Sequence, residues 1–334
     1  MRKLPSLILT CTLACTLAPG ARATNANAKR TEDVYGQLQR NAWYLPTADH
    51  AANLYVTELG AGPLVVFLHG GPGNDFHYII DALRPQLDKH KFVLFDQRGS
   101  LLSPVPDAAA SKLSMGQLVD DLETLRKSLG VPKLVLFAHS FGTLLTLSYY
   151  QAHPDHVAGL VLAASVPPSF ELKTWLSEMR PRQKALRERK YEIAAATTAA
   201  HLPADPKNDT AEQKTIRWRI ESQASVNVIN LDHWREVVGG KVFYNSDVAD
   251  AISSTIPPSF DIRAVLEAHP VPITIIQGDR DYIDPAAASW SGEVEAGKVQ
   301  ESVMPSASHY SWIDDPSRFA EALDHGLSRA DAGR

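Results

Sequence analysis

Short apolar runs separated by amphipathic stretches constrain the fold of this 334-residue chain more than any other feature. A parallel strand in the middle of a sheet is buried on both faces and has such a continuous apolar pattern. Two more segments, 53–59 and 299–304, are also strand-like. We therefore predict a mostly parallel sheet, whose central strands are the runs at 64–68, 92–95, 134–137, 160–162 and 273–276.

Helical patterns lie between these runs. Four leucines at helical spacing would share one face of a helix over residues 115–129, with Ser114 as its N-cap and Gly130 at its end. Alternation of strands and helices predicts a doubly wound α/β core with right-handed crossovers.

The alternation stops after residue 166. Residues 167–258 are charged, alanine-rich and helical in pattern, with a proline pair at each end. We interpret this segment as a helical cap inserted between two parts of one core, 41–166 and 259–334. Residues 24–40 are polar and without periodicity, which predicts a mobile lead-in.

Residues 1–23 have the pattern of a secretory signal peptide: a positive start, an apolar stretch over 7–17 and a small-x-small site at 21–23. The stretch is too short to span a bilayer. We expect an exported protein, periplasmic or secreted, without a stable membrane anchor after cleavage. Both cysteines, Cys11 and Cys15, would be removed, and lipidation of Cys15 is the minor alternative.

The composition is that of a globular enzyme, with 44% hydrophobic and 21% charged residues and a formal net charge of −5. Basic residues are not interleaved with aromatic ones, so a nucleic-acid partner has no electrostatic support. His153 and His156 lack companion thiols or clustered acids in the sequence, so we predict no metal site. The oligomeric state is left open.

The segment 134–150 reads as strand, tight turn and helix, with Ser140 at the turn. Ala138 and Gly142 flank the serine at two residues on either side, and such small residues let the backbone make the sharp turn of a nucleophile elbow. The following helix directs its first amides to the same point, so the Phe141 amide is a candidate oxyanion donor.

A glycine-rich segment, His-Gly-Gly-Pro-Gly at 69–73, follows an earlier strand. Ligand sites of open α/β sheets lie at such carboxyl ends. Gly71 is the candidate second oxyanion donor, and a turn needed only for chain reversal is the alternative. The segment lacks the lysine and hydroxyl residue of a phosphate loop and the spacing of a dinucleotide site, so we expect no cofactor.

A serine hydroxyl needs a base, and the base needs an orienting acid; after a nucleophile elbow, the acid precedes the histidine in the chain. Asp281 lies in the loop after the strand predicted at 273–277. We prefer it to Asp279 and Asp284, because the position three after the glycine of this loop is the usual one.

His309 is the candidate base. It follows the predicted last strand in a loop that precedes a helix, whereas His325 lies within the final helical pattern and is the weaker rival. A surface histidine is the alternative for His309.

Together with the elbow, segments 69–73 and 96–100 (Asp-Gln-Arg-Gly-Ser) resemble the proline iminopeptidase type of serine aminopeptidase in the α/β-hydrolase superfamily. The resemblance covers about 53–166 and 272–309. It implies an α/β-hydrolase fold with an inserted helical cap, and an enzyme that releases N-terminal residues, often proline, from short peptides. Metal ions and cofactors are not implied.

The resemblance also implies that cap carboxylates hold the substrate ammonium, and Glu221 matches the position of one of them. The sequence departs from the family after this residue, at 222–225, where aromatic residues are usual. The alternative for Glu221 is an exposed helix carboxylate paired with Arg217, four residues earlier.

These residues imply acyl transfer through a covalent intermediate on Ser140, with His309 as base, Asp281 as orienting acid and the amides of Gly71 and Phe141 around the oxyanion. Two alternatives stay open: a carboxylesterase or lactonase with the same machinery, and a catalytically inactive binding protein.

Overall fold

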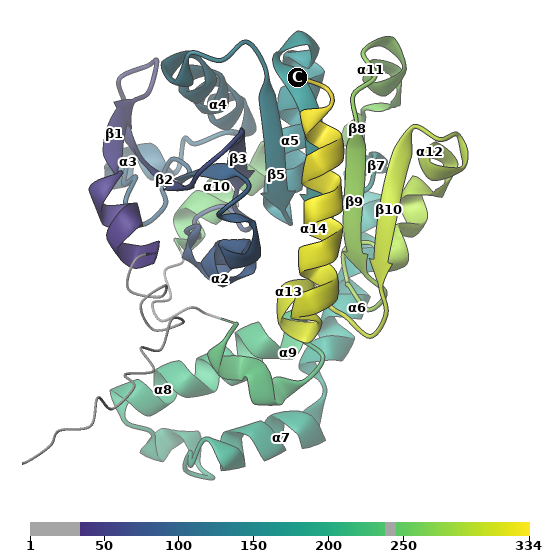
Figure 1. Cartoon of the computed structure of the whole chain (residues 1–334). Helices are drawn as coiled ribbons and strands as arrows, with labels where there is room; N and C mark the ends of the chain where they lie inside the picture. Colours follow the sequence, from purple (N-terminus) through teal and green to yellow (C-terminus); the bar gives the residue numbers. More distant parts are fainter. Residues whose placement is uncertain (1–33, 238–244) are drawn as a thin grey trace, which may run out of the picture.

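An eight-stranded sheet forms the centre of the computed structural model, which describes residues 34–237 and 245–334 (Figure 1). The strand order is β1-β2-β4-β3-β5-β6-β9-β10. Six neighbouring strands, from β4 to β10, run parallel, and β2 and β1 add an antiparallel edge. The strands are β1 (Trp43–Pro46), β2 (Asn53–Gly60), β3 (Leu64–Leu68), β4 (Lys91–Phe95), β5 (Leu134–His139), β6 (Val157–Ala163), β9 (Ile273–Gly278) and β10 (Val299–Met304).

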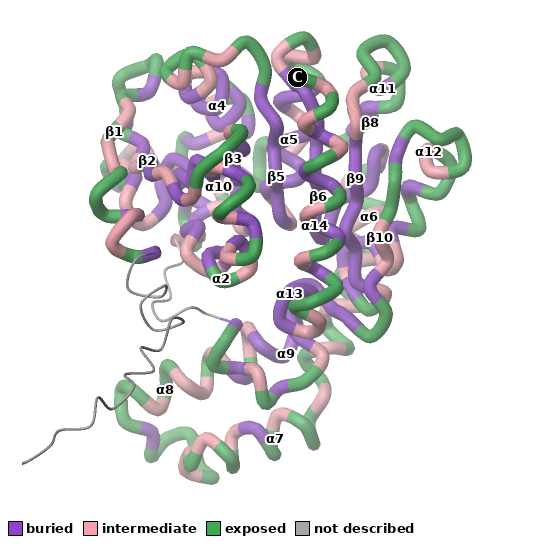
Figure 2. Tube along the Cα trace, viewed as in Figure 1, coloured by how far each residue is buried: buried purple, intermediate pink, exposed green. Residues whose placement is uncertain are grey.

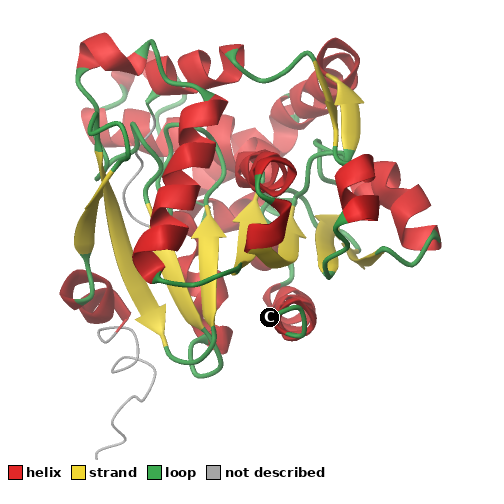
Figure 3. Cartoon of the chain, turned by 90° about the horizontal axis from the view of Figure 1, so that it is seen from above, coloured by secondary structure: helices red, strands yellow, loops and turns green. Residues whose placement is uncertain are grey.

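Helices cover both faces of the sheet, as the view from above shows (Figure 3). Successive side chains of a strand point to opposite faces, so Val66 and Leu68 of β3 join one apolar cluster while Val65 and Phe67 join the other. The first cluster includes α4 (Met115–Leu129), α5 (Phe141–Ala152) and α10 (Ser246–Ser254), and the second α2 (Ile80–Leu83), α13 (Ser311–Asp314) and α14 (Pro316–Asp331). The doubly wound, mostly parallel α/β core is thus confirmed.

Helix α4 has the predicted bounds and caps. Ser114 and Gln117 form a capping box, and Gly130 ends the helix in the left-handed region at φ 68°. The shorter elements of the core are η1 (His77–Ile79), η2 (Arg84–Gln86), α3 (Asp107–Ala110), η3 (Pro154–His156), α11 (Arg263–Ala268), η7 (Pro285–Trp290) and α12 (Ser291–Glu295).

The cap lies beyond the carboxyl ends of the parallel strands (Figure 1). Two short strands, β7 (Ser169–Glu171) and β8 (Ser259–Asp261), follow the two proline pairs and form an antiparallel ribbon that joins the two ends of the inserted segment, which the sequence pattern did not predict. The other elements are α6 (Leu172–Arg187), α7 (Lys190–Ala199), η4 (Pro206–Asn208), α8 (Ala211–Trp218), the π-helical η5 (Arg219–Ala224), α9 (Ser225–Asn227) and η6 (Leu231–Arg235).

The N-terminal region differs in part from the prediction. The predicted signal peptide, residues 1–23, lies outside the described residues. Residues 34–40 of the predicted mobile lead-in are helical, because Val34 and Leu38, one helical turn apart, are only 5% and 4% exposed and pack into the core. Figure 2 shows buried residues concentrated in the strands and on the inner faces of the helices. Within 34–237 and 245–334, every helix is too short or too polar to cross a bilayer.

Candidate active site

Ser140 lies at the turn between β5 and α5. Its backbone has φ 56° and ψ −125°, a conformation that side-chain-bearing residues rarely adopt. The strain is held by hydrogen bonds on both sides: the Ser140 amide donates to the Ala163 carbonyl at 3.0 Å, and its carbonyl accepts from the Thr143 amide at 2.8 Å. The hydroxyl is thereby placed at the carboxyl end of the sheet.

Steric contact explains why a small residue stands two positions after the serine, at Gly142. A Cβ atom on Gly142 would lie 2.3 Å from the Leu68 carbonyl oxygen and 2.8 Å from that of His69. These are backbone atoms of the neighbouring strand and its following turn, so neither can move aside cheaply. The elbow therefore packs against the 69–73 segment, which we call the oxyanion turn.

His309 joins Ser140 to Asp281. Its Nε2 lies 2.9 Å from Ser140 Oγ, and its Nδ1 lies 3.1 and 3.2 Å from the two carboxylate oxygens of Asp281. The histidine is 3% exposed and the aspartate is wholly buried. Asp281 Oδ1 also accepts from the Ile283 amide at 2.9 Å, which fixes the carboxylate in its loop. This is the geometry of a nucleophile, base and orienting acid.

The rival residues lie elsewhere. Asp284 accepts hydrogen bonds from the amide and hydroxyl of Ser289, and burial raises its pKa. Asp279 pairs weakly with its neighbour Arg280, at 3.9 Å. His325 is exposed on α14.

Two backbone amides, those of Phe141 and Gly71, are the candidate oxyanion donors. Phe141 is the first residue of α5, where an amide has no acceptor within the helix. In the oxyanion turn, the Gly70 amide donates to the Tyr78 hydroxyl, so the next amide, that of Gly71, is the candidate donor. Gly71 has φ 61°, which suits glycine.

The two segments that carry the family resemblance contact each other. The Gln97 amide donates to His69 Nε2 at 3.0 Å, and the Gln97 side chain donates to the His69 carbonyl at 2.8 Å. Burial lowers the pKa of His69 to about 4, so its ring stays neutral and can accept. Through these two hydrogen bonds of Gln97, the 96–100 segment holds His69, the first residue of the oxyanion turn, in place.

Cap residues that the sequence did not single out hold the loops of the acid and the base. Arg182 of α6 donates to the carbonyl oxygens of Tyr282 and Ile283, at 2.9 and 3.1 Å. On the other side, Asn227 of α9 accepts from the Tyr310 amide at 2.7 Å. Arg182 is one of many cationic residues in the cap, and its spacing gave no signal of this role.

Glu221 is an exposed helix carboxylate paired with Arg217, which is the alternative that the sequence offered for it. Its carboxylate is 44% exposed and lies 3.5 Å from Arg217, four residues earlier on the same helical segment. Arg217 makes closer contacts with Asp209, at 2.6 and 3.0 Å.

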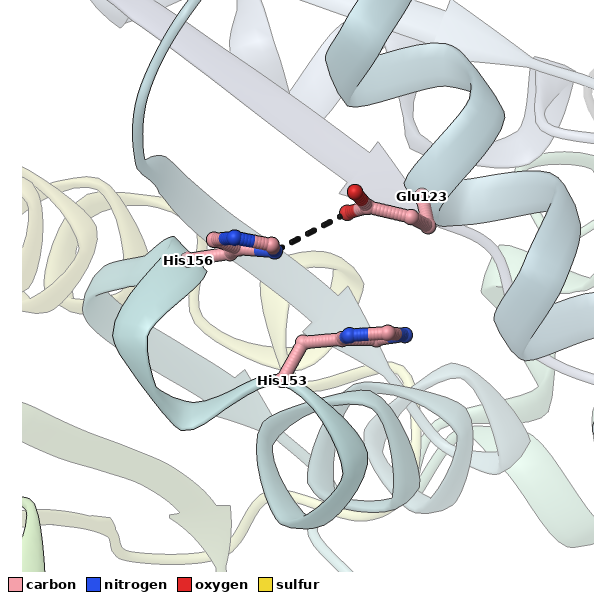
Figure 4. Close-up of side chains that lie close together, drawn as sticks. All are labelled: Glu123, His153 and His156. Atoms are coloured by element: carbon pink, nitrogen blue, oxygen red, sulfur yellow. Dashed lines mark hydrogen bonds and ion pairs between the residues drawn. The ribbon is translucent and has the colours of Figure 1, made fainter.

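The structure brings an acid to the two histidines that had no partner in the sequence. Glu123 of α4 lies beside His156 and His153, and the potential ligand atoms are within 4.8 Å of one another (Figure 4). Yet Arg126 binds both oxygens of Glu123, at 2.8 and 2.9 Å. The two imidazole rings are stacked only 12° from parallel, whereas a metal ion must lie in the plane of each ring that binds it. These side-chain orientations therefore do not converge on a metal.

Comparison with known proteins places this geometry in a family. The family model described as alpha/beta hydrolase fold matches residues 63–316. A proline iminopeptidase from Arabidopsis thaliana is 44% identical over 103 residues, which cover 30% of this chain and 26% of that protein. One from Lactobacillus acidophilus is 26% identical over 280 residues, covering 80% and 90%.

A solved structure of a proline iminopeptidase-related protein from Thermus thermophilus has a TM-score of 0.61 at 25% identity, covering 88% of this chain and 99% of that one. Solved esterases match at 20% identity or less, which shows the fold alone. The chain spans only 26% to 39% of the length of the first curated relatives. Since the family model covers most of its length, this chain belongs to the α/β-hydrolase family, and within that family it resembles the proline iminopeptidases.

Proposed function

We propose that this protein is a serine hydrolase that acts through an acyl-enzyme, and that it is an aminopeptidase releasing N-terminal residues from short peptides. The contact of 2.9 Å between His309 Nε2 and Ser140 Oγ carries the chemical part of the proposal. The aminopeptidase part is supported by the likeness to proline iminopeptidases over most of the chain.

The reaction follows from the placement of the protons. His309 holds its own proton on Nδ1, facing Asp281, so Nε2 is free to take the proton of the Ser140 hydroxyl as the oxygen attacks the scissile carbonyl. The new oxyanion accepts from the amides of Gly71 and Phe141.

Collapse of the tetrahedral intermediate breaks the carbon–nitrogen bond. His309 returns the proton to the leaving amine, and the acyl group stays on Ser140. Water then attacks the ester, with His309 taking its proton, and the second collapse frees the acid and restores the hydroxyl. Asp281 stays ionised throughout and stabilises the imidazolium.

The test is Ser140→Ala together with labelling by a fluorophosphonate probe. Wild type should label at Ser140 and hydrolyse chromogenic esters and aminoacyl amides, and Ser140→Ala should do neither above the residual level of the oxyanion hole. Equal turnover by the variant would remove the serine mechanism. Failure of the wild type to label would favour an inactive binding protein.

A carboxylesterase or lactonase is the second candidate. It is favoured by the position of Glu221, which is paired with Arg217 and half exposed. Free and N-acylated aminoacyl amides separate the two, because an aminopeptidase must lose activity when the ammonium is blocked. For an aminopeptidase that uses Glu221, Glu221→Gln should raise KM for aminoacyl amides while leaving ester hydrolysis unchanged.

We also propose that the protein is exported, as the signal-peptide pattern of residues 1–23 predicts. N-terminal sequencing of the protein from a periplasmic extract tests this, and an intact Met1 in the mature protein would oppose it.

A further inference from the structure

A buried chain of three hydrogen bonds connects the oxyanion turn to the catalytic histidine. The Gly70 amide contacts the Tyr78 hydroxyl, the Tyr78 hydroxyl contacts His139 Nδ1 at 2.9 Å, and His139 Nε2 contacts the His309 carbonyl at 3.1 Å. His139 immediately precedes the nucleophile and is 1% exposed.

The direction of every proton in this chain is fixed. The Gly70 amide can only donate, so the Tyr78 oxygen accepts, and its single proton is left for His139. The His309 carbonyl can only accept, so His139 must carry its proton on Nε2 and accept at Nδ1. The neutral tautomer of His139 with its proton on Nε2 satisfies all three bonds and also gives the Tyr78 proton an acceptor at Nδ1.

Burial keeps the two side chains in these states. It holds the pKa of His139 well below its usual range, with the nearby His309 lowering it further. Burial also raises the pKa of the Tyr78 hydroxyl, so the phenol keeps the proton that it donates. A neutral His139 matters for catalysis, because its ring centroid is 4.7 Å from that of His309, and a second cation there would oppose the imidazolium.

Aromatic packing stiffens the same connection. The Tyr78 ring stacks on Tyr310, the residue after the base, at 5.4 Å and 11°. Trp312 lies edge-on to His139 at 4.8 Å and stacks on Tyr310 at 4.6 Å. The close packing of these rings leaves the chain of three hydrogen bonds, which we call the relay, little room to change its geometry.

We propose that Tyr78 and His139 are positioning residues that lock the oxyanion turn and the base loop into one register, so that the second oxyanion donor and His309 stay aligned on Ser140. The proposal rests on the serine-hydrolase chemistry proposed above, and not on the preference for peptides over esters. Neither side chain is assigned a contact with the substrate.

The relay predicts a defined kinetic signature. Tyr78→Phe keeps the ring but removes the acceptor of Gly70 and the donor to His139, and His139→Leu removes both bonds of the imidazole. Each should lower kcat by about 10- to 100-fold at nearly constant KM, since small displacements of catalytic groups have effects of this size. Because both variants break one chain, Tyr78→Phe/His139→Leu should lose little more than either single variant. His139→Gln, which can donate and accept, should recover part of kcat.

Tyr149→Phe is the matched control. Tyr149 is also buried, and its hydroxyl donates to Glu123 at 2.8 Å on α4, outside the catalytic loops. This variant should lose a comparable amount of thermal stability but keep wild-type kcat. The control separates loss of stability from loss of positioning.

The experiment is steady-state hydrolysis of a p-nitrophenyl ester by the full-length variants, with melting curves and the rate of fluorophosphonate labelling. A kcat for Tyr78→Phe within two-fold of wild type, or additive losses in the double variant, would overturn the proposal. If His139→Leu does not fold, Tyr78→Phe and His139→Gln still decide it. An inactive wild type would instead refute the proposed function itself.

Discussion

Asp281→Asn tests whether the buried carboxylate sets the tautomer of His309. In the wild type, Asp281 Oδ1 accepts from the Ile283 amide at 2.9 Å, and Oδ2 lies 3.1 Å from His309 Nδ1. An asparagine must turn its carbonyl oxygen to the Ile283 amide, because two donors cannot face each other. Its NH₂ group then faces His309 Nδ1 and forces the imidazole to carry its proton on Nε2.

This tautomer cannot serve as a base, because the nitrogen that faces Ser140 is already protonated. The same substitution in another serine–histidine–aspartate triad lowers kcat about 10⁴-fold, and we expect a loss of this order, about 5.5 kcal/mol in the barrier. KM for the ester substrate should change little, since Asp281 is wholly buried behind the histidine.

Asp284→Asn is the matched control, three residues further along the same loop. Its carboxylate bonds to Ser289 and not to His309, and burial raises its pKa, so the charge can be removed at little cost. We expect kcat within about three-fold of wild type, because the catalytic groups stay in place. The reasoning would be refuted by a loss below ten-fold in Asp281→Asn, or by equal losses in both variants, measured with one ester at one pH.

The packing and the charges support three further predictions. Gly142→Ala places a Cβ against backbone carbonyls and should destabilise the fold by about 3 kcal/mol. Gly116→Ala, at an open position on α4, should be neutral or stabilising by up to about 1 kcal/mol, and urea unfolding of both variants checks this. Burial raises the pKa of Asp96 to about 7. Since an unfolded aspartate has a pKa near about 4, stability should fall as pH rises from about 4 to about 7 and then level off, and Asp96→Asn should flatten that part of a stability–pH curve. Arg182→Ala removes the cap's hydrogen bonds to two carbonyls of the acid loop and should lower kcat about ten-fold with little change in KM, which steady-state kinetics would measure; an unchanged kcat would show that the loop holds its own geometry.

Features with a local cause could be predicted from the sequence. The capping box and terminal glycine set the bounds of α4, and continuous apolar runs marked the central strands, because burial on both faces leaves no position for a polar side chain. The elbow around Ser140 was also readable, since the turn needs a small residue two positions later, at Gly142. In the lead-in, Val34 and Leu38 are at helical spacing, but two apolar residues are too few to predict a helix.

Contacts between distant residues were decided by the tertiary structure. Chain order made Asp281 and His309 candidates, but only the meeting of three strand ends brings His309 to a serine 169 residues away and an aspartate 28 residues away. The relay through Tyr78 joins residues 61 positions apart, and no local pattern marks it.

The charged side chains show the same division. Sequence supplied both interpretations of Glu221, and the fold placed its carboxylate beside Arg217. Likewise, Glu123 is distant from His153 and His156 in the sequence, and the packing of α4 brings its carboxylate beside them. Local backbone preferences act over a few residues, so the sequence by itself determined the strands, the capped helix and the elbow. Side-chain partners depend on which surfaces the packed sheet and cap bring together, and only the tertiary structure decides that.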